Sequence, residues 1–187
     1  MRVIGGSAGG RKLLSPPGTR VRPTADRVKE ALFSILLSRF GNFCGLTILD
    51  LFAGTGNLGI EALSRGCDHA VFVDSHPQSI RTIRDNLQLT GFTNSAEVIS
   101  GDAVKVMKQL QQRSTSFDIV FLDPPYREAE LLQSVLNEFA AATVLAPGGV
   151  LVVETDKGSP PTQADKLAIL DRRLYGDTAI TFFRLTD

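Results

Sequence analysis

Four consecutive residues, Asp123-Pro124-Pro125-Tyr126, form the segment best suited to chemistry. They follow the apolar run Phe117–Leu122, which predicts a buried strand. Prolines donate no hydrogen bond and hold a turn rigid, with its carbonyls directed outward. The Asp123 carboxylate and the Pro124 carbonyl could then accept both amino protons of a planar ring on which Tyr126 stacks. Such contacts would expose the amino lone pair to an electrophilic methyl group. The alternative is a proline-stiffened loop in which Tyr126 only packs.

A glycine-rich turn follows the earlier predicted strand, Thr47–Ala53. It reads Asp50-Leu-Phe-Ala-Gly54-Thr-Gly56-Asn-Leu-Gly59, and Asp74 stands 20 residues after Gly54. This spacing matches a dinucleotide fingerprint, but Asp50 puts a carboxylate where a pyrophosphate needs N–H groups and no anion. S-adenosylmethionine carries a sulfonium and an ammonium and suits this turn better. Asp74, at the end of the predicted strand Ala70–Asp74, could accept the ribose hydroxyls.

A third acidic residue, Asp102, follows the predicted strand Ala96–Ile99. It could accept a proton of the adenine amino group, and it could also cap the helix predicted from Ala103. The predicted cofactor site therefore comprises Asp50, Phe52, Ala53, Gly54, Thr55, Gly56, Asp74, Ser75, Asp102, Ala103 and Asp123.

Strands and helices alternate from residue 46 onward, which predicts a parallel sheet with helices on both faces. Ligands of such sheets bind at the carboxyl ends of the strands, where the acidic residues stand. An earlier helix is expected from the N-cap Thr24 to Gly41. The last two strands, Leu167–Asp171 and Thr178–Leu185, have no helix between them and predict an antiparallel edge. We expect an α/β, Rossmann-like fold with a mostly parallel seven-stranded sheet.

Composition describes an ordinary globular protein of 187 residues, with 43% hydrophobic and 21% charged residues. No apolar run approaches the roughly 20 residues that span a bilayer. No signal peptide is visible, so we expect a cytoplasmic protein without a membrane partner. Cys44 and Cys67 are expected to be buried thiols, and no ligand spacing implies a metal.

The formal net charge is zero, but the charges are unevenly distributed. Residues 1–30 hold seven basic and two acidic residues, against 13 and 18 in the remainder. A basic run is often only a solvated surface, yet phosphate contacts depend on local charge. We predict a basic, RNA-facing hairpin extension over residues 1–23 and a catalytic domain over 24–187. The candidate RNA contacts are Arg2, Arg11, Lys12, Arg20, Arg22 and Arg27.

Together these motifs resemble the class I S-adenosylmethionine-dependent methyltransferases that modify exocyclic amines through an Asp/Asn-Pro-Pro-Tyr loop. Within that class the chain is similar to the RsmD family over nearly its whole length. The matching segments are 2–6, 10–13, 22–33, 50–66, 123–126 and 175–178.

The resemblance implies methyl transfer to N2 of a guanine in bacterial 16S rRNA (guanine 966 type), within a 30S particle or an assembly intermediate. A chain of this length could work as a monomer, which is the oligomeric state we expect. The resemblance also implies that Asp50 and residues 53–56 hold the methionine part of the cofactor. Asp74 would hold the ribose, and Asp102 and Ala103 the adenine.

Alternative functions remain open on the sequence alone. The same loop serves enzymes that methylate adenine N6 in DNA or glutamine in proteins. Outside this class, the glycine spacing is compatible with an NAD-binding oxidoreductase. The basic segment is compatible with a non-catalytic RNA-binding module.

Overall fold

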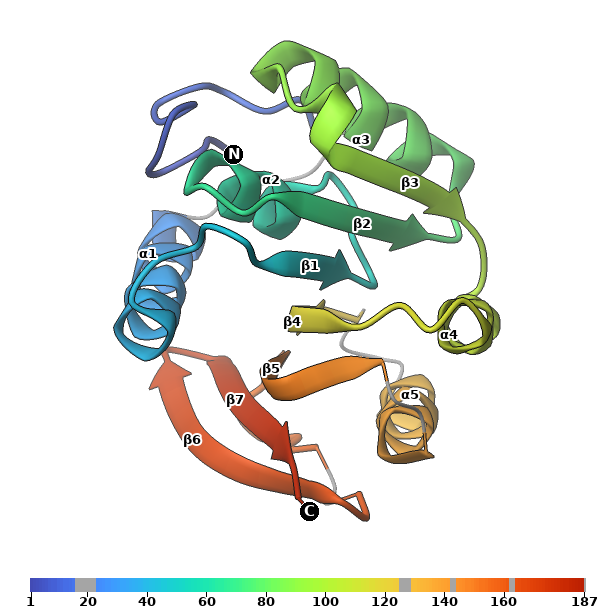
Figure 1. The fold of residues 1–187 in the computed structure, drawn as a ribbon. Coiled ribbons are helices and arrows are strands. Elements are labelled where there is room, and N and C mark those ends of the chain that lie inside the picture. Colours follow the sequence, from blue (N-terminus) through green and yellow to red (C-terminus); the bar gives the residue numbers. More distant parts are fainter. Residues whose placement is uncertain (16–22, 125–128, 142–143, 162–163, 187) are drawn as a thin grey trace.

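A seven-stranded sheet forms the centre of the protein in the computed structural model (Figure 1). The structure describes residues 1–15, 23–124, 129–141, 144–161 and 164–186. The strand order is β3-β2-β1-β4-β5-β7-β6, and β7 runs in the direction opposite to the other six strands. The strands are β1 (Thr47–Asp50), β2 (His69–Asp74), β3 (Ala96–Ser100), β4 (Phe117–Leu122), β5 (Leu145–Asp156), β6 (Leu167–Tyr175) and β7 (Thr178–Leu185).

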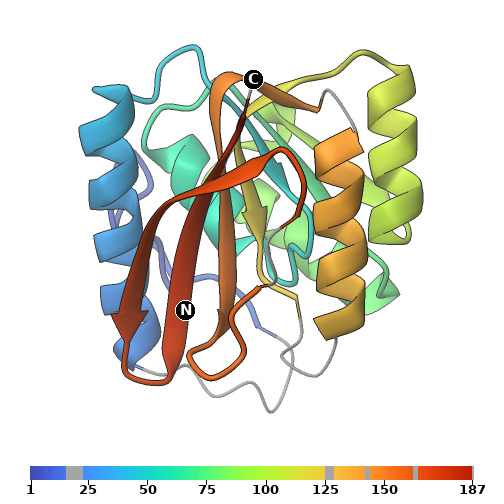
Figure 2. The same ribbon diagram turned by 90° about the horizontal axis from the view of Figure 1, so that it is seen from below.

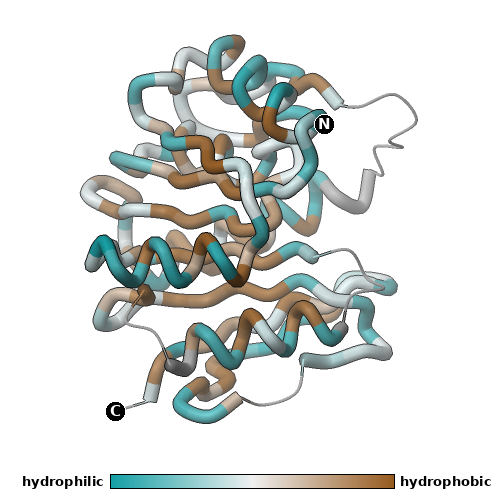
Figure 3. Tube along the Cα trace, turned by 90° about the vertical axis from the view of Figure 1, so that its right-hand side faces the viewer, coloured by the Kyte–Doolittle hydropathy of each residue, from teal (hydrophilic) through white to brown (hydrophobic). Residues whose placement is uncertain are grey.

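Helices cover both faces of this sheet, as Figure 2 shows. Helices α1, α2 and α3 share one hydrophobic cluster, and α4 and α5 share the other. Neighbouring strand residues divide between the clusters: Ile48 faces the first and Leu49 the second. The tube in Figure 3 is accordingly brown along the central strands. The helices are α1 (Pro23–Phe40), α2 (Asn57–Ser64), α3 (Pro77–Thr90), α4 (Ala103–Gln112) and α5 (Ala129–Ala141), with a 3-10 turn η1 (Thr93–Ser95).

The predicted α/β fold, with its parallel sheet and antiparallel edge, is confirmed. Some predicted bounds are wrong. Helix α1 already begins at Pro23, so Thr24 is not its N-cap; proline suits a first turn because it lacks an N–H that would go unpaired. Strand β1 ends at Asp50 rather than Ala53, because the chain turns there into the glycine loop.

The N-terminal segment, residues 1–15, folds back on itself in the hairpin order that its pattern predicts, but without regular strands. Its two arms pair through an antiparallel bridge between Arg2 and Lys12, and the Gly10 N–H donates to the Val3 carbonyl at 2.9 Å. The segment packs beside α2 and α3 (Figure 1), with Val3 and Leu13 buried in the first cluster. Polar contacts to these two helices hold much of its backbone in place.

A buried carboxylate on α2, Glu61, ties this segment down. It accepts the N–H groups of Ile4 (2.7 Å) and Gly5 (2.9 Å) and pairs with Lys29 (3.1 Å) and Arg65 (2.8 Å). Burial lowers the pKa of Lys29, whereas these donors hold the pKa of Glu61 below its usual value against the effect of burial. Four donors surround the Glu61 carboxylate and stabilise its charged form. The lowered pKa of Glu61 therefore determines the state of the pair, and both groups are charged at neutral pH.

Gly59, the third glycine of the motif, is required by packing. A Cβ there would lie 2.3 Å from Cε1 of the buried Phe72 on β2. We expect Gly59→Ala to lower the free energy of unfolding by about 1–3 kcal/mol, because the clash outweighs the better helix propensity of alanine. Urea unfolding measures this loss. The loss should shrink when Phe72→Leu is added, and an undiminished loss in the double variant would contradict the packing explanation.

The two cysteines differ from their prediction in one respect. Cys67 is buried, and burial raises the pKa of its thiol to about 12, but Cys44 is exposed because it lies in the turn before β1.

Within the described ranges, no group of three or more His, Cys, Asp or Glu residues is arranged to hold a metal ion. No helix in the described part of the chain has the length and apolarity needed to cross a membrane.

Candidate active site

Acidic residues gather where neighbouring parallel strands end. Asp50 ends β1, Asp74 ends β2, Asp123 follows β4, and Glu154 lies in β5. Since β1 lies between β2 and β4, and β4 pairs with β5, the sheet order brings the four carboxyl groups to one edge. Such an edge attracts a cationic ligand and repels a polyphosphate.

Asp50 is almost completely buried, with 2% of its surface exposed. Its Oδ2 accepts the N–H of Gly59 at 3.0 Å, which fixes the first turn of α2. Burial raises the pKa of Asp50 to about 7; the Gly59 N–H opposes this, and the charge of Asp74 adds to it. The carboxyl group therefore sits near its midpoint at neutral pH, ready to ionise beside a cation.

Asp74 holds the other end of the glycine loop. Its Oδ2 accepts the N–H of Gly54 at 2.8 Å, and its Oδ1 accepts the N–H of His76 at 2.8 Å. Gly54 and Gly56 both have positive φ, which residues with a side chain rarely adopt. Asp74 and Asp50 thus hold the two ends of the loop between β1 and α2. The sequence pattern did not reveal this structural role.

The other predicted cofactor residues lie along the same edge. Asp102 is exposed and caps α4, where its Oδ1 accepts the N–H of Lys105 at 3.0 Å. Ala103 begins α4 and is buried. Phe52 is half-buried in the loop after β1, and Ser75 is exposed beside Asp74. Phe52, Ser75 and Asp102 stand on loops that directly follow β1, β2 and β3, and Ala103 begins the helix after the third of these loops.

The structure describes only the first two residues of the predicted catalytic motif. Asp123 is exposed and Pro124 is buried directly after β4, whereas Pro125 and Tyr126 lie outside the described residues. Close-packed protein atoms and the negative charges of Glu154 and Asp50 raise the pKa of Asp123 well above its usual value. Because the side chain is exposed, we attribute the raised pKa mainly to repulsion by the carboxylates of Glu154 and Asp50.

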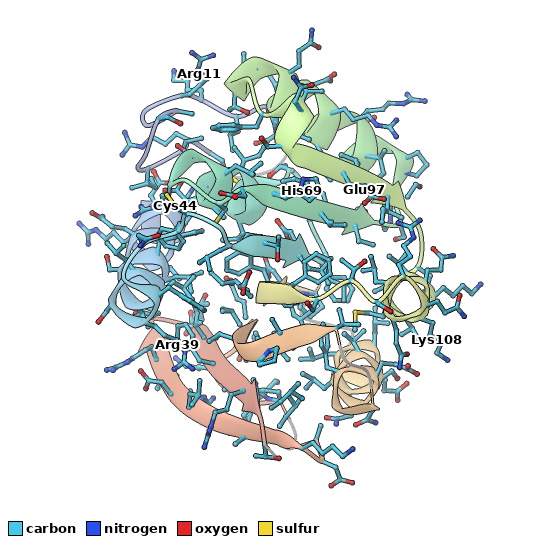
Figure 4. All side chains as sticks on the ribbon, viewed as in Figure 1. Arg11, Arg39, Cys44, His69, Glu97 and Lys108 are labelled. Atoms are coloured by element: carbon cyan, nitrogen blue, oxygen red, sulfur yellow. The ribbon has the colours of Figure 1, made fainter. Side chains whose placement is uncertain are left out.

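Of the predicted RNA contacts, four are described and all four lie at the N-terminal end of the chain. Arg2 pairs with Asp26 of α1 at 3.1 Å, and Arg11 donates to the backbone carbonyl of Leu89. Figure 4 shows Arg11 at the outer edge of the N-terminal segment. Lys12 and Arg27 are exposed, and Arg20 and Arg22 lie outside the described residues.

Sequence reasoning missed three polar residues around the site. Glu154 falls in a predicted strand without an assigned role, although its position at a predicted strand end was a usable signal. Asn86 on α3 and Lys29 on α1 are buried and contact the glycine loop region. Nothing in the local pattern of either helix distinguishes them from surface residues.

Comparison with known proteins identifies the family of this chain. A family model described as "Conserved hypothetical protein 95" matches residues 1–184. The chain belongs to this family. It corresponds to the RsmD family of methyltransferases, so the resemblance seen in the motifs is confirmed.

Relatives in this family are similar along nearly their whole length. "Putative rRNA methyltransferase YlbH" of Bacillus subtilis is 40% identical over 98% of both chains. "Ribosomal RNA small subunit methyltransferase D" of Haemophilus influenzae is 34% identical over 94% of this chain and 89% of its own. The solved structure of "Putative methyltransferase yhhF" of Escherichia coli has a TM-score of 0.84 and 30% identity, covering 99% of this chain and 97% of that one. The family member described here is accordingly a methyltransferase.

Proposed function

We propose that the protein transfers a methyl group from S-adenosylmethionine to the exocyclic N2 of a guanine in 16S rRNA of the small ribosomal subunit. One observation carries the proposal: Asp123, the first residue of the amine-binding motif, lies at the same sheet edge as Asp50 and Asp74. The relatives' names, which specify ribosomal RNA of the small subunit in one case, support the substrate class.

The residues present fit this cofactor. It supplies an electrophilic methyl group on a positively charged sulfur, next to an ammonium. The buried Asp50 carboxylate matches that positive charge, and Asp74 keeps lone pairs for two ribose hydroxyls beyond its bonds to the loop.

The protein's part in the reaction is orientation and charge stabilisation. Asp123 and the Pro124 carbonyl accept the amino protons and hold N2 in line with the carbon–sulfur bond. Transfer of the cofactor's methyl group would form the N–C bond as the S–C bond breaks, and Asp123 would stabilise the positive charge that this places on N2. Asp123 or water would then take the excess N2 proton, which balances the charge that the cofactor loses with its methyl group. The base must first leave its stack to reach this loop.

Two other classes are less compatible with the site. NAD binding would place a pyrophosphate beside Asp50 and Asp74, where carboxylates repel it. A non-catalytic RNA-binding module would not need acidic strand ends. Calorimetric titration separates these cases: we expect S-adenosylhomocysteine to bind and NAD not to bind, and the reverse would overturn the proposal.

The acceptor is tested by offering the enzyme tritiated S-adenosylmethionine with four substrates in parallel. These are 30S particles lacking the modification, naked 16S rRNA, duplex DNA and a glutamine-containing protein extract. We expect label in 30S particles or rRNA alone. Label confined to DNA or protein would replace the proposed substrate by one of the alternatives.

RNA binding should depend on the basic surface of the N-terminal segment and α1. We expect Arg11→Gln, Lys12→Gln and Arg27→Gln together to weaken binding to 16S rRNA. The slope of log affinity against log salt should become shallower by about 2, or about 0.7 for each lost phosphate contact. Filter binding over a series of salt concentrations measures this slope, and S-adenosylhomocysteine affinity should stay unchanged.

A matched control removes the same charge from α4 and its C-cap, through Lys105→Gln, Lys108→Gln and Arg113→Gln, all exposed on the opposite face of the sheet. This control should leave the slope unchanged. Equal effects of the two triple variants would show that only net charge matters and would contradict a localised RNA surface.

A further inference from the structure

Asn86 is fully buried on α3, yet none of its side-chain hydrogen bonds stays within its own helix. Its Nδ2 donates to the Thr55 carbonyl at 2.9 Å and to the Leu14 carbonyl at 3.1 Å. Its Oδ1 accepts the N–H of Leu14 at 2.7 Å. Both donors and the acceptor of the amide are thus used on two distant segments of the chain.

These two segments are the predicted cofactor loop and the predicted RNA-facing segment. Thr55 lies between Gly54 and Gly56 in the predicted cofactor loop, and Leu14 belongs to the basic N-terminal segment. One side chain therefore joins the backbone of the cofactor loop to the backbone of the segment. The loop and the segment are also in direct contact, since the Thr55 hydroxyl lies 3.8 Å from Sδ of Met1.

A second bridge lies at the other end of the loop. The buried Lys29 donates to the Arg2 carbonyl at 2.7 Å and to Oδ1 of Asn57 at 2.7 Å. Asn57 is the first residue of α2 and directly follows Gly56. The N-terminal segment consequently contacts the loop region at Thr55 through Asn86 and at Asn57 through Lys29.

The loop depends on such support. Its two glycines at positive φ leave its backbone conformationally free in the absence of outside contacts. The Asn86–Thr55 bond is buried, so loss of the amide would leave the Thr55 carbonyl without a partner where water cannot replace it, and would also release the Leu14 backbone.

We propose that Asn86 is a positioning residue for the cofactor, because it holds the glycine loop in its binding shape by tying it to the docked N-terminal segment. The segment is then a structural part of the cofactor site as well as an RNA-facing surface. This inference rests on the proposed function only for the identity of the cofactor.

The test is Asn86→Leu, which keeps the side-chain size and removes all three hydrogen bonds. Calorimetry should show the Kd for S-adenosylhomocysteine rising about tenfold or more, with no RNA needed. In methyl transfer to 30S particles, KM for S-adenosylmethionine should rise likewise, while kcat at saturation stays within about twofold, because only uniform binding is lost.

Thr82→Val is the matched control. Thr82 is a buried polar residue one turn earlier on α3, but its hydroxyl donates only to Gln78 of the same helix, at 3.0 Å. This variant should bind S-adenosylhomocysteine as the unmodified protein does. Equal losses in Thr82→Val and Asn86→Leu would mean that α3 has merely been destabilised, which would overturn the inference.

A variant on the segment side keeps the test decisive even if Asn86→Leu fails to fold. Leu14→Pro removes the N–H that Oδ1 of Asn86 accepts, at an exposed side chain. It should raise the same Kd by about threefold or more, and the double variant should lose no more than the larger single loss. Normal affinity in Leu14→Pro, or independent losses in the double variant, would refute the link. These affinity measurements need no methyl acceptor. They can therefore refute the role of Asn86 without affecting the proposed rRNA substrate, and a different substrate would leave the role of Asn86 intact.

Discussion

Asp123→Ala should abolish most methyl transfer while leaving the protein folded and able to bind its cofactor. The side chain is exposed, so its removal leaves no buried cavity. In the proposed reaction Asp123 stabilises the positive charge that develops on the amine. Loss of one such stabilising group lowers kcat by about 100- to 1000-fold. We expect that loss in tritium transfer to 30S particles, with a change in S-adenosylhomocysteine affinity of less than about tenfold.

The control for this variant is Glu97→Ala, which removes an exposed carboxylate from β3 that pairs with Arg113 at 3.1 Å. It should transfer methyl groups at the normal rate. If Asp123→Ala retained full activity, the proposed role of the motif would be wrong, whatever the fate of the cofactor site.

Cofactor affinity should depend on pH through Asp50. The pKa of this carboxyl group is raised to about 7, and the ionised form binds best to the ammonium group that S-adenosylhomocysteine shares with the methyl donor. Below pH 7 a proton must be released on binding, so the Kd for S-adenosylhomocysteine should rise about tenfold between pH 8 and pH 6. Asp50→Asn should weaken binding by about 10- to 100-fold at pH 8 and remove most of this dependence.

The free energy of unfolding should change with pH in the direction opposite to cofactor affinity. The pKa of Asp50 is about 7 in the folded protein against an ordinary value of 3.8, so the native state keeps a proton that the unfolded chain loses between these values. The contribution of Asp50 to stability therefore falls as pH rises from about 4 to 7 and is flat above that. Asp50→Asn, whose carbonyl can still accept the Gly59 N–H, should gain about 1–4 kcal/mol at pH 8 in urea unfolding.

Asp68→Asn is the matched control, since Asp68 also accepts a backbone N–H, from Gly45 at 2.9 Å, but is exposed. It should change neither affinity nor its pH dependence. A pH-independent Kd in the unmodified protein would contradict the assigned role of Asp50.

The fold and the acidic strand ends could be predicted because they follow from local patterns. Apolar runs mark the strands, and the carboxyl ends of parallel strands meet at one edge, so the amino-acid sequence alone is enough to group Asp50, Asp74 and Asp123. The second function of Asp74 in holding Gly54 could not be predicted, since a turn aspartate looks the same with or without that contact.

The environment of the N-terminal segment was the part that local patterns could not reveal. Glu61 stands in an amphipathic stretch of α2 and looks like a surface residue, yet it is completely buried because residues 4 and 5 cover it. Asn86 and Leu14 are 72 residues apart, and no periodicity records such a pairing. Such contacts depend on how the segment docks, which only the assembled fold determines.

The proposed activity is methylation of the exocyclic amine of one guanine in 16S rRNA. It is tested by digesting 16S rRNA to nucleosides and to mapped fragments after reaction with 30S particles, and by identifying the methylated nucleotide by mass spectrometry. We expect a single N2-methylguanosine that is absent after reaction with Asp123→Ala. A methyl group on a ring nitrogen, on a ribose or on another base would contradict the proposed chemistry.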